Sequence, residues 1–335
     1  MAATTNEPQV KKAFDQRASN DEVEAIEREH WRGILRDIVR DWRLYLMFLP
    51  LLLFLILWKY LPISSMIIAF KYYLPTDGVY GSVFTGLSNY QTLLSTGAFW
   101  SAFRNTFILS FYGLCFGFPF PIILALFFSE IKNRIVLSVV QVLTYLPKFI
   151  STVVMVSIVA MLIRAGGVSS PGPIGSLLQS WFGWSDLIND PKAFRAIYTI
   201  SGIWQTGGYS SIVYFAAILA ISPTNYEAAR IDGANKMQQL RYVTIPGMAG
   251  TLVIMLILNI GQLLTIGYEK VYLLQTYGTD TYETSEIVAT YVIHGFMTAQ
   301  QGVGTAADMF NSLLSMVLVL GSNKIAKKVS NTSLF

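Results

Sequence analysis

The sequence is poor in the residues that build metal sites and hydrolytic active sites. Its 335 residues include one cysteine, Cys115, and two histidines, His30 and His294. A single cysteine excludes an intrachain disulfide framework and any cysteine-based metal site, and the two histidines lie too far apart in sequence to suggest a metal-binding cluster. No Ser/His/Asp or Cys/His arrangement is evident. The sequence therefore predicts no catalytic residue and no metal ligand.

Nucleotide-binding motifs are also missing. The chain has no phosphate loop ending in Gly-Lys-Ser/Thr, no ATPase signature and no Rossmann fingerprint. The glycine-rich stretch 166–173 lacks the Lys-Ser/Thr that ends a phosphate loop and is interpreted as an ordinary loop. We therefore expect no cofactor on this chain, and any use of ATP requires a separate subunit.

Charged residues make up only 13% of the chain, whereas hydrophobic residues make up 53%. Runs of about 20 apolar residues can cross the roughly 30 Å hydrocarbon core of a bilayer, so the sequence predicts an all-α membrane protein. The first apolar run follows a polar N-terminus and is long enough to remain as a span, which argues against a cleavable signal peptide. The predicted spans, to within a few residues, are 44–61, 106–128, 135–162, 197–221, 248–264 (extending to about 274) and 306–320.

Lysine and arginine are distributed unequally between the two sides of these spans. Cytoplasmic loops of membrane proteins carry the excess of these residues, which predicts that both termini and the loop beginning at Glu227 are cytoplasmic. The basic side consists of the N-terminal tail, the 130–134 loop, the Glu227 loop, Lys324, Lys327 and Lys328. The facing loops carry only Lys71, Arg104, Arg164, Lys192, Arg195 and Lys270.

The N-terminal region divides into two parts before the membrane domain. Residues 1–20 are polar without periodicity, which predicts a disordered cytoplasmic tail, and residues 21–43 have a helical pattern. Basic residues recur four apart on one face of this helix, which is either a solvated face or a juxtamembrane helix lying on anionic headgroups. The membrane domain is predicted at 44–323 and a cytoplasmic C-terminal tail at 324–335. The basic stripe is Arg28, Arg32, Arg36 and Arg40.

A polar segment, 227–246, separates two long apolar runs. Its small and charged residues predict a short helix, 224–243, lying across a membrane surface, and Ser222-Pro223 ahead of it can end one helix and begin the next. Gly233 permits close backbone approach to another surface, and Pro246 is expected to end the element. An ordinary cytoplasmic loop helix is the alternative that composition alone allows.

The order of residues in this segment resembles the loop that identifies type I ABC-importer permeases. The pattern is Glu-Ala-Ala, then Gly233, then Val-Thr-Ile-Pro, with Val243 and Ile245 in place of the family's Ile and Leu. The resemblance implies the maltose-permease-like fold with six transmembrane helices, both termini inside, in the bacterial cytoplasmic membrane. It assigns coupling to an ATPase to Glu227, Ala228, Ala229, Arg230, Ile231, Asp232, Gly233 and Pro246.

The same resemblance implies the partners of the chain. Permeases of this type work as heterodimers of two related subunits with two ATP-binding subunits, which carry ATP and Mg, and with an extracellular solute-binding protein. The loop forms a coupling helix that docks into a groove of the ATP-binding subunit. The expected surroundings are thus a lipid bilayer and these proteins, and no nucleic acid is expected.

Further motifs resemble those of one branch of the carbohydrate-uptake permeases. That branch imports alginate, aldouronate and other polysaccharide-derived oligosaccharides. The resemblance runs from about residue 44 to the C-terminus and implies an oligosaccharide substrate. Lys148 is a departure, because many relatives have histidine there, and we infer no acid specificity from it. The motifs are Lys59-Tyr60-Leu61-Pro62, Ile68-Ala69-Phe70-Lys71, Gly86-Leu87 with Asn89-Tyr90, Arg104-Asn105-Thr106 and the run from Thr144 to Ser151.

Candidate substrate-contacting residues follow from the chemistry of sugar recognition. Aromatic faces stack on sugar C–H surfaces, amides and carboxylates bind hydroxyl groups, and a charge within the membrane is by default a functional hypothesis. Lys148, about 20 Å along a straight helix from Arg134, is expected near mid-membrane. Interfacial belts, helix-bridging polar residues and structural ion pairs are the alternatives. The candidates are Lys148, Ser151, Trp204, Gln205, Tyr209, Asn259, Gln262, Tyr268 and Glu269.

Other functions stay open on the sequence. A type I permease for another solute, such as an amino acid or polyamine, has the same coupling motif but not the sugar-branch motifs. An ion-coupled secondary transporter predicts an internal inverted repeat, and no convincing repeat is present. A membrane anchor without transport activity explains the spans but not the spacing of the 227–246 motif.

Overall fold

The computed structural model describes residues 39–164, 172–184, 187–277 and 281–330. It consists of two compact units, Met1–Ser65 and Met66–Phe335, which are considered separately. The disorder predicted over 1–20 and most of the helix predicted over 21–43 lie outside the described residues.

In the first unit, an apolar helix follows a short charged turn. The carboxylate of Asp41 lies 3.1 Å from the guanidinium of Arg40, and α2 (Trp42–Leu55) begins directly afterwards without a single buried residue. The helix continues through a π-helical turn, Ile56–Tyr60, into the 3-10 helix Leu61–Phe70. The whole stretch is long and apolar enough to cross a membrane, which confirms the first predicted span. Exposure of large apolar side chains along it suits a helix whose solvent is lipid.

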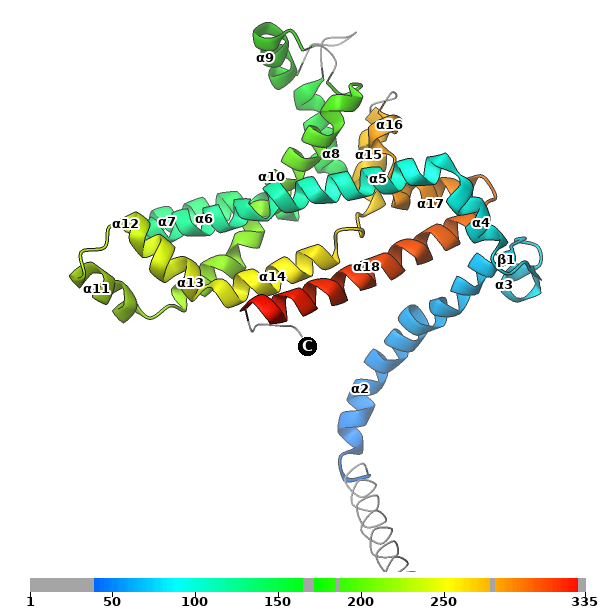
Figure 1. The fold of residues 1–335 in the computed structure, drawn as a ribbon, viewed down its shortest axis with the longest axis horizontal. Coiled ribbons are helices and arrows are strands. Elements are labelled where there is room, and N and C mark those ends of the chain that lie inside the picture. Colours follow the sequence, from blue (N-terminus) through cyan, green and yellow to red (C-terminus); the bar gives the residue numbers. More distant parts are fainter. Residues whose placement is uncertain (1–38, 165–171, 185–186, 278–280, 331–335) are drawn as a thin grey trace, which may run out of the picture. The chain divides into compact units, whose positions relative to one another are not determined.

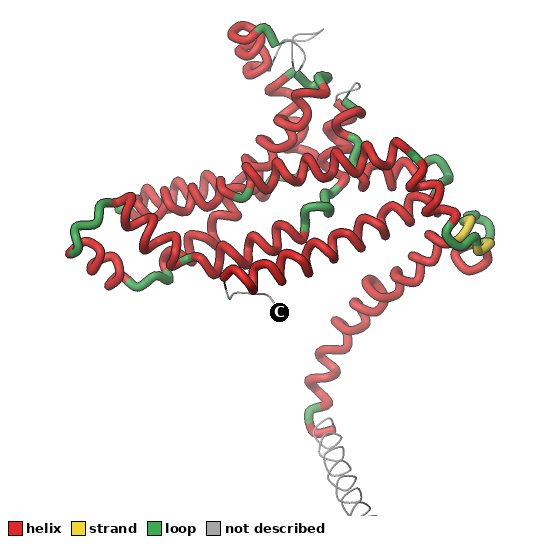
Figure 2. The backbone as a smooth tube through the Cα atoms, viewed as in Figure 1, coloured by secondary structure: helices red, strands yellow, loops and turns green. Residues whose placement is uncertain are grey.

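The described part of the second unit is built almost entirely of helices (Figure 2). Its exception is a short antiparallel hairpin of β1 (Lys71–Tyr72) and β2 (Val83–Phe84), in which Lys71 pairs with Phe84. The helices are α3 (Gly78–Gly81), α4 (Ser88–Ser95), α5 (Gly97–Tyr112), α6 (Pro119–Glu130), α7 (Arg134–Tyr145), α8 (Thr152–Ile163), α9 (Pro173–Phe182), α10 (Pro191–Leu219), α11 (Pro223–Ile231), α12 (Lys236–Gln239), α13 (Ile245–Gly247), α14 (Ala249–Gly261), α15 (Tyr268–Tyr277), α16 (Tyr282–Ser285), α17 (Val288–Met297) and α18 (Gln301–Ser330).

The number of membrane spans agrees with the sequence, although their shapes differ. By length and composition, three helices in the described ranges can cross a membrane, and the number rises to six if each of three bent helix pairs is one span. The second predicted span, 106–128, is longer than expected, because a π-helical turn at Gly113–Gly117 keeps α5 and α6 in one helix, Gly97–Glu130. The last helix, α18, also continues past the predicted domain boundary at 323.

The third predicted span, 135–162, is not a straight helix. α7 and α8 meet at 103° across a break next to the 3-10 turn Leu146–Phe149. Pro147 within this turn cannot donate a backbone hydrogen bond, and Ser151 caps the start of α8 by accepting a bond from Val154 N at 3.4 Å. Lys148 lies in this turn, before the bend, and its side chain is exposed. The mid-membrane depth expected for Lys148 stays a prediction.

The fifth predicted span is interrupted as well. α14 ends at Gly261 and α15 begins at Tyr268, so the continuous helix expected up to about 274 is wrong. The backbone between them is held by side chains from two other helices: Ser110 donates to the carbonyl of Leu263, and Asn311 donates to that of Leu264. Non-helical backbone at membrane depth needs such partners, because no water is available there.

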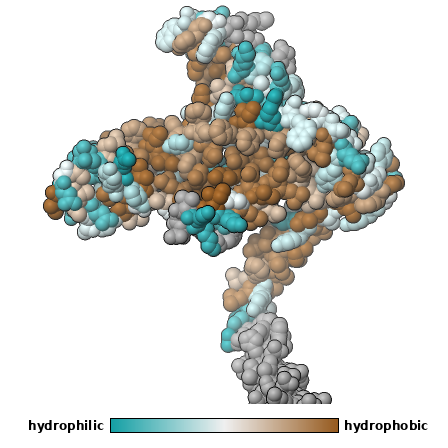
Figure 3. Space-filling model, in the orientation of Figure 1, coloured by the Kyte–Doolittle hydropathy of each residue, from teal (hydrophilic) through white to brown (hydrophobic). Residues whose placement is uncertain are grey.

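The helices around this break pack closely (Figure 1). α10 lies along α6 and contacts α14, which in turn lies along α18. Two adjacent glycines permit the approach of α10 to its neighbours. A Cβ atom on Gly208 would come within 2.0 Å of the Thr144 carbonyl oxygen, and one on Gly207 within 2.7 Å of the Phe120 ring. Figure 3 shows apolar surface over the middle of this bundle and hydrophilic residues around α11 and α12.

Candidate functional site

The polar segment between α10 and α14, residues 222–247, is called the coupling loop below. The single helix predicted at 224–243 is wrong, because the segment contains two helices, α11 and α12, followed by a π-helical turn, Leu240–Thr244. Gly233 has φ of +78°, a conformation that favours glycine. It ends α11 in a Schellman motif, in which Ala234 N bonds to Ala229 O at 2.8 Å and Gly233 N to Arg230 O at 3.1 Å.

The restart of the helix has a clear local cause. Asn235 caps α12 by accepting from Gln238 N, while the Gln238 side chain accepts from Asn235 N, which is a complete capping box. The glycine followed by this Asn-x-x-Gln pattern is a sequence signal for a helix–turn–helix arrangement. Helical backbone then continues through Pro246, and the chain turns by 64° into α14 next to Met248. Pro246 thus precedes the turn instead of ending the helix itself.

Three contacts hold the coupling loop in shape. The hydroxyl groups of Tyr226 and Thr244 are 3.0 Å apart, and the amide of Gln239 donates to Ala234 O at 2.8 Å. Lys236 Nζ lies 2.7 Å from a carboxylate oxygen of Glu130 at the end of α6, in an exposed ion pair. An exposed pair adds little stability, so the two hydrogen bonds and the helix caps determine the loop's shape.

The coupling loop exposes several large apolar side chains. Ile231, Met237 and Tyr242 are 86%, 69% and 68% exposed, and they lie among the exposed charges of Glu227 and Arg230. A groove of about 860 Å³ separates the loop from the ends of α6 and α10. Exposed apolar side chains among polar ones are typical of a protein-docking surface.

A second site lies among the spans. A cavity of about 360 Å³ is bordered by the α5–α6 helix, α10, α14 and α15, and we call it the membrane cavity. α10 contributes a stripe with one residue every four positions, and such residues share one face of a helix. The stripe is Tyr198, Gly202, Thr206, Ser210 and Tyr214. The other polar or flexible side chains of the lining are Thr199, Gln205, Met255, Asn259 and Lys270.

Lys270 is the charged residue of this lining. Its ammonium group donates to the carbonyl of Tyr198 at 2.7 Å and lies 4.4 Å from the centre of the same residue's ring. A Cβ on Gly202 would be 3.0 Å from Nζ, so the absence of a side chain at 202 makes room for the ammonium. The break between α14 and α15 matters here, because it brings Asn259 and Lys270 to one cavity, whereas a straight helix would separate them by about 16 Å.

The structure brings together only part of the predicted substrate-contacting set. Gln205 and Asn259 line the membrane cavity; Gln205 also donates to Ile150 O at 3.2 Å, and Asn259 to Met255 O at 2.7 Å. The other predicted residues do not border it. Lys148 lies at the α7–α8 bend, Ser151 caps α8, Trp204 faces a different groove, Tyr209 packs edge-on against Phe149, and Gln262, Tyr268 and Glu269 lie exposed around the α14–α15 break.

Sequence reasoning missed several lining residues, and one signal could have found them. Tyr198, Thr199, Tyr214 and Lys270 border the cavity but were not predicted as site residues. The spacing of four along α10 is visible in the sequence. The residues at this spacing are a mixture of tyrosine, glycine, threonine and serine, however. Only the packing of the neighbouring helices shows that this face of α10 does not face lipid. No local sequence pattern indicates that Lys270 borders the same cavity.

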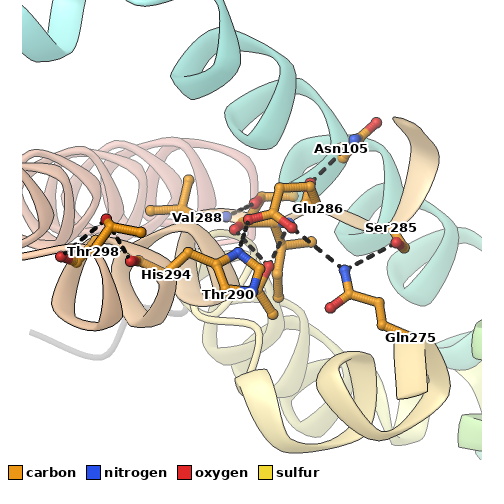
Figure 4. A network of polar contacts seen from close by, with 11 residues as sticks. Asn105, Gln275, Ser285, Glu286, Val288, Thr290, His294 and Thr298 are labelled. Carbon is orange, nitrogen blue, oxygen red and sulfur yellow. Dashed lines mark hydrogen bonds and ion pairs between the residues drawn. The ribbon is translucent and has the colours of Figure 1, made fainter. Parts of the chain in front are cut away.

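A polar network fixes the segment between α15 and α17 to the spans (Figure 4). The amide of the fully buried Asn105 on α5 donates to the carbonyls of Glu283 and Glu286 at 2.9 and 3.1 Å. His294 Nδ1 lies 3.0 Å from one carboxylate oxygen of Glu286, and Gln275 bonds to Ser285 at 2.9 Å. The network borders a second cavity of about 510 Å³, which Arg104 and Tyr282 also line.

Comparison with known proteins identifies the family. Residues 117–318 match the family described as binding-protein-dependent transport system inner membrane component. The chain belongs to this family. It is therefore a component of a transport system of the inner membrane that works with a binding protein, in agreement with the apolar helices and with the localisation expected from the sequence.

The chain is also similar to individual proteins along almost its whole length. It is 34% identical over 317 residues to the polygalacturonan/rhamnogalacturonan transport system permease protein YteP of Bacillus subtilis (strain 168), covering 93% of this chain and 97% of that protein. It is 32% identical over 307 residues to protein LplB of the same organism, covering 91% and 94%.

A solved structure confirms the predicted fold. A chain in the crystal structure of a bacterial ABC transporter involved in the import of the acidic polysaccharide alginate superposes with a TM-score of 0.79 at 35% identity. The match covers 89% of this chain and 99% of that one. The type I ABC-importer permease fold, which the motif at 227–246 predicted, is thus confirmed.

Proposed function

We propose that this chain is one of two related permease subunits of an ATP-driven importer of oligosaccharides derived from complex glycans. The observation that carries the proposal is that one helix belongs to both sites. α10 lines the membrane cavity from Tyr198 to Tyr214 and ends five residues later, directly before the coupling loop. A displacement of the loop therefore moves a wall of the cavity.

The mechanism is alternating access driven from outside this chain. Two ATP-binding subunits bind ATP and Mg and close, and the apolar surface of the coupling loop docks into a groove on one of them. Glu227, exposed on α11, makes a polar contact there. Closure rotates α10 and α14 with the loop, the cavity opens outward to receive a glycan from the external binding protein, and hydrolysis returns it to the inward-facing form.

The lining of the membrane cavity favours a sugar over other solutes. Tyrosine rings present apolar faces with a polar hydroxyl edge, and the side chains of Gln205, Thr206 and Ser210 offer donors and acceptors for hydroxyl groups. The names of the relatives point in the same direction, since they concern polysaccharide-derived substrates. An importer of another solute remains the competing proposal, whereas family membership argues against an ion-coupled secondary transporter.

The test uses the assembled importer in lipid nanodiscs with its binding protein. ATP hydrolysis is followed across a panel of glycan oligomers, amino acids and polyamines. Stimulation by one class of glycan, dependent on the binding protein, is the expected result. Stimulation by an amino acid or polyamine alone would establish the competing proposal, and a preparation without any ATPase subunit would overturn the importer mechanism.

A further inference from the structure

We propose that the Lys270 ammonium is the anchor for a sugar carboxylate in the membrane cavity, so that the transported oligosaccharides contain uronic acid residues. The inference rests on the proposed function and specifies its substrate class. Its first basis is the charge of the cavity. Among the described residues that line it, Lys270 is charged and none is acidic.

The second basis is the incomplete set of partners around the ammonium. A lysine ammonium has three N–H donors, and the described residues provide one acceptor, the Tyr198 carbonyl. In the described ranges no carboxylate lies within ion-pair distance of Nζ. A cation held inside a membrane protein without a counterion is costly. A carboxylate supplied by the substrate removes this cost and uses the remaining donors.

The third basis is the way the lysine is held in place. The Tyr198 ring, 4.4 Å from Nζ, lies beside the ammonium, and Gly202 leaves the space that it occupies. The charge is thus positioned by two residues of the α10 stripe before any ligand binds. Pre-positioning of this kind increases the affinity for a matching ligand, because less order has to be imposed on binding.

The remaining lining distinguishes a uronate from a small inorganic anion. Thr206 and Ser210 follow Gly202 on the same face of α10, and Gln205 and Asn259 add amide groups. A uronic acid residue presents one carboxylate and several hydroxyls on a ring, which matches one cation among hydroxyl, amide and tyrosine side chains. Lys148, the cation noted in the sequence, is exposed at the α7–α8 bend and does not border the cavity.

The experiment measures uptake by the complete importer in proteoliposomes with its binding protein. The probes are oligogalacturonates and neutral galacto-oligosaccharides of equal length. The variants are Lys270→Met, Lys270→Arg, Gly202→Ala and a control, Lys192→Met, which removes an exposed cation from the first turn of α10, the helix of Gly202. Assembly and thermal melting of each complex are checked first.

The expected result is selective. Lys270→Met lowers oligogalacturonate uptake at least roughly tenfold, as expected for loss of a charge-assisted hydrogen bond, and leaves any uptake of the neutral oligomer unchanged or higher. Lys270→Arg retains part of the acidic uptake, Gly202→Ala reduces it, and Lys192→Met does not.

Other outcomes would overturn the proposal in distinguishable ways. Equal loss of acidic and neutral uptake in Lys270→Met would assign the lysine a structural role. Wild-type uptake of neutral oligomers only would remove the acidic substrate class but keep the glycan importer. Uptake of neither glycan, with a functional ATPase present, would remove the proposed function itself.

Discussion

The hydroxyl group of Tyr226 lies 3.0 Å from Oγ1 of Thr244. This contact joins α11, at the entrance of the coupling loop, to the π-helical turn that leads out of it towards α14. Thr244 is buried, whereas most side chains of the loop are exposed. The pair therefore stabilises the loop internally and is not part of its docking surface.

Loss of this pair should weaken transmission without preventing docking. In Tyr226→Phe, one hydrogen bond worth about 1 kcal/mol is removed and the ring is retained. We expect fewer molecules of substrate imported per ATP hydrolysed, with an unchanged amount of ATPase subunit bound. The measurement is the ratio of uptake to hydrolysis in proteoliposomes, and an unchanged ratio would show that the contact does not transmit motion.

Glu227 should matter for coupling but not for folding. Within the described residues it forms no hydrogen bond or ion pair, and its side chain is exposed. Glu227→Ala is expected to reduce uptake several-fold while the melting temperature stays within about 1 °C, because nothing inside the chain is lost. Asn225→Ala, two residues earlier and so on another face of α11, is the matched control. Equal effects of both variants would contradict a specific contact at Glu227.

Gly233 combines two requirements that substitutions can separate. Its φ of +78° disfavours most side chains, but a Cβ there would meet nothing within 4 Å in this chain. Asparagine tolerates this conformation, so Gly233→Asn should fold and retain most coupling if only the turn matters. Gly233→Trp should fold but uncouple hydrolysis from uptake, because the large ring blocks close docking. Normal uptake by the tryptophan variant would refute the docking role.

Gly208 is predicted to be essential for packing. A Cβ at this position would lie 2.0 Å from the Thr144 carbonyl oxygen, so Gly208→Ala must push α10 away from α7. We expect loss of stability of several kcal/mol and little assembled complex in detergent. Gly250→Ala is the control, since it has open space on the helix α14 and should be neutral or stabilising by up to about 1 kcal/mol.

The polar network of Figure 4 gives a prediction about stability. Asn105 is fully buried and satisfies two carbonyls, while its own oxygen accepts from Arg195 at 3.2 Å. Asn105→Leu keeps the number and branching of the side-chain heavy atoms but leaves these groups unpaired, which costs about 2 to 4 kcal/mol. The melting temperature of the complex should fall by several degrees. Ser101→Ala, on the same helix at the border of the cavity of about 510 Å³, should not change the melting temperature.

The sequence by itself determined the membrane class, the approximate positions of the spans and the family. Long apolar runs allow few other solutions, because only a helix satisfies its own backbone in lipid. The coupling motif is local, so the order of Glu227, Gly233 and Pro246 was sufficient to recognise it. Its interruption into α11 and α12 was also encoded locally, in Gly233 and in the capping pair Asn235 and Gln238, but a continuous helix was predicted.

The membrane cavity was decided by the tertiary structure. Its lining combines residues from four parts of the chain, and the α14–α15 break that places Lys270 beside Tyr198 is held by Ser110 and Asn311, which lie far away in sequence. A hydropathy pattern cannot distinguish a polar residue facing a cavity from one that bridges two helices. The sequence therefore favoured Lys148 as a candidate and placed Lys270 in a facing loop, whereas the packing of the helices leaves Lys148 exposed and puts Lys270 at the border of the cavity.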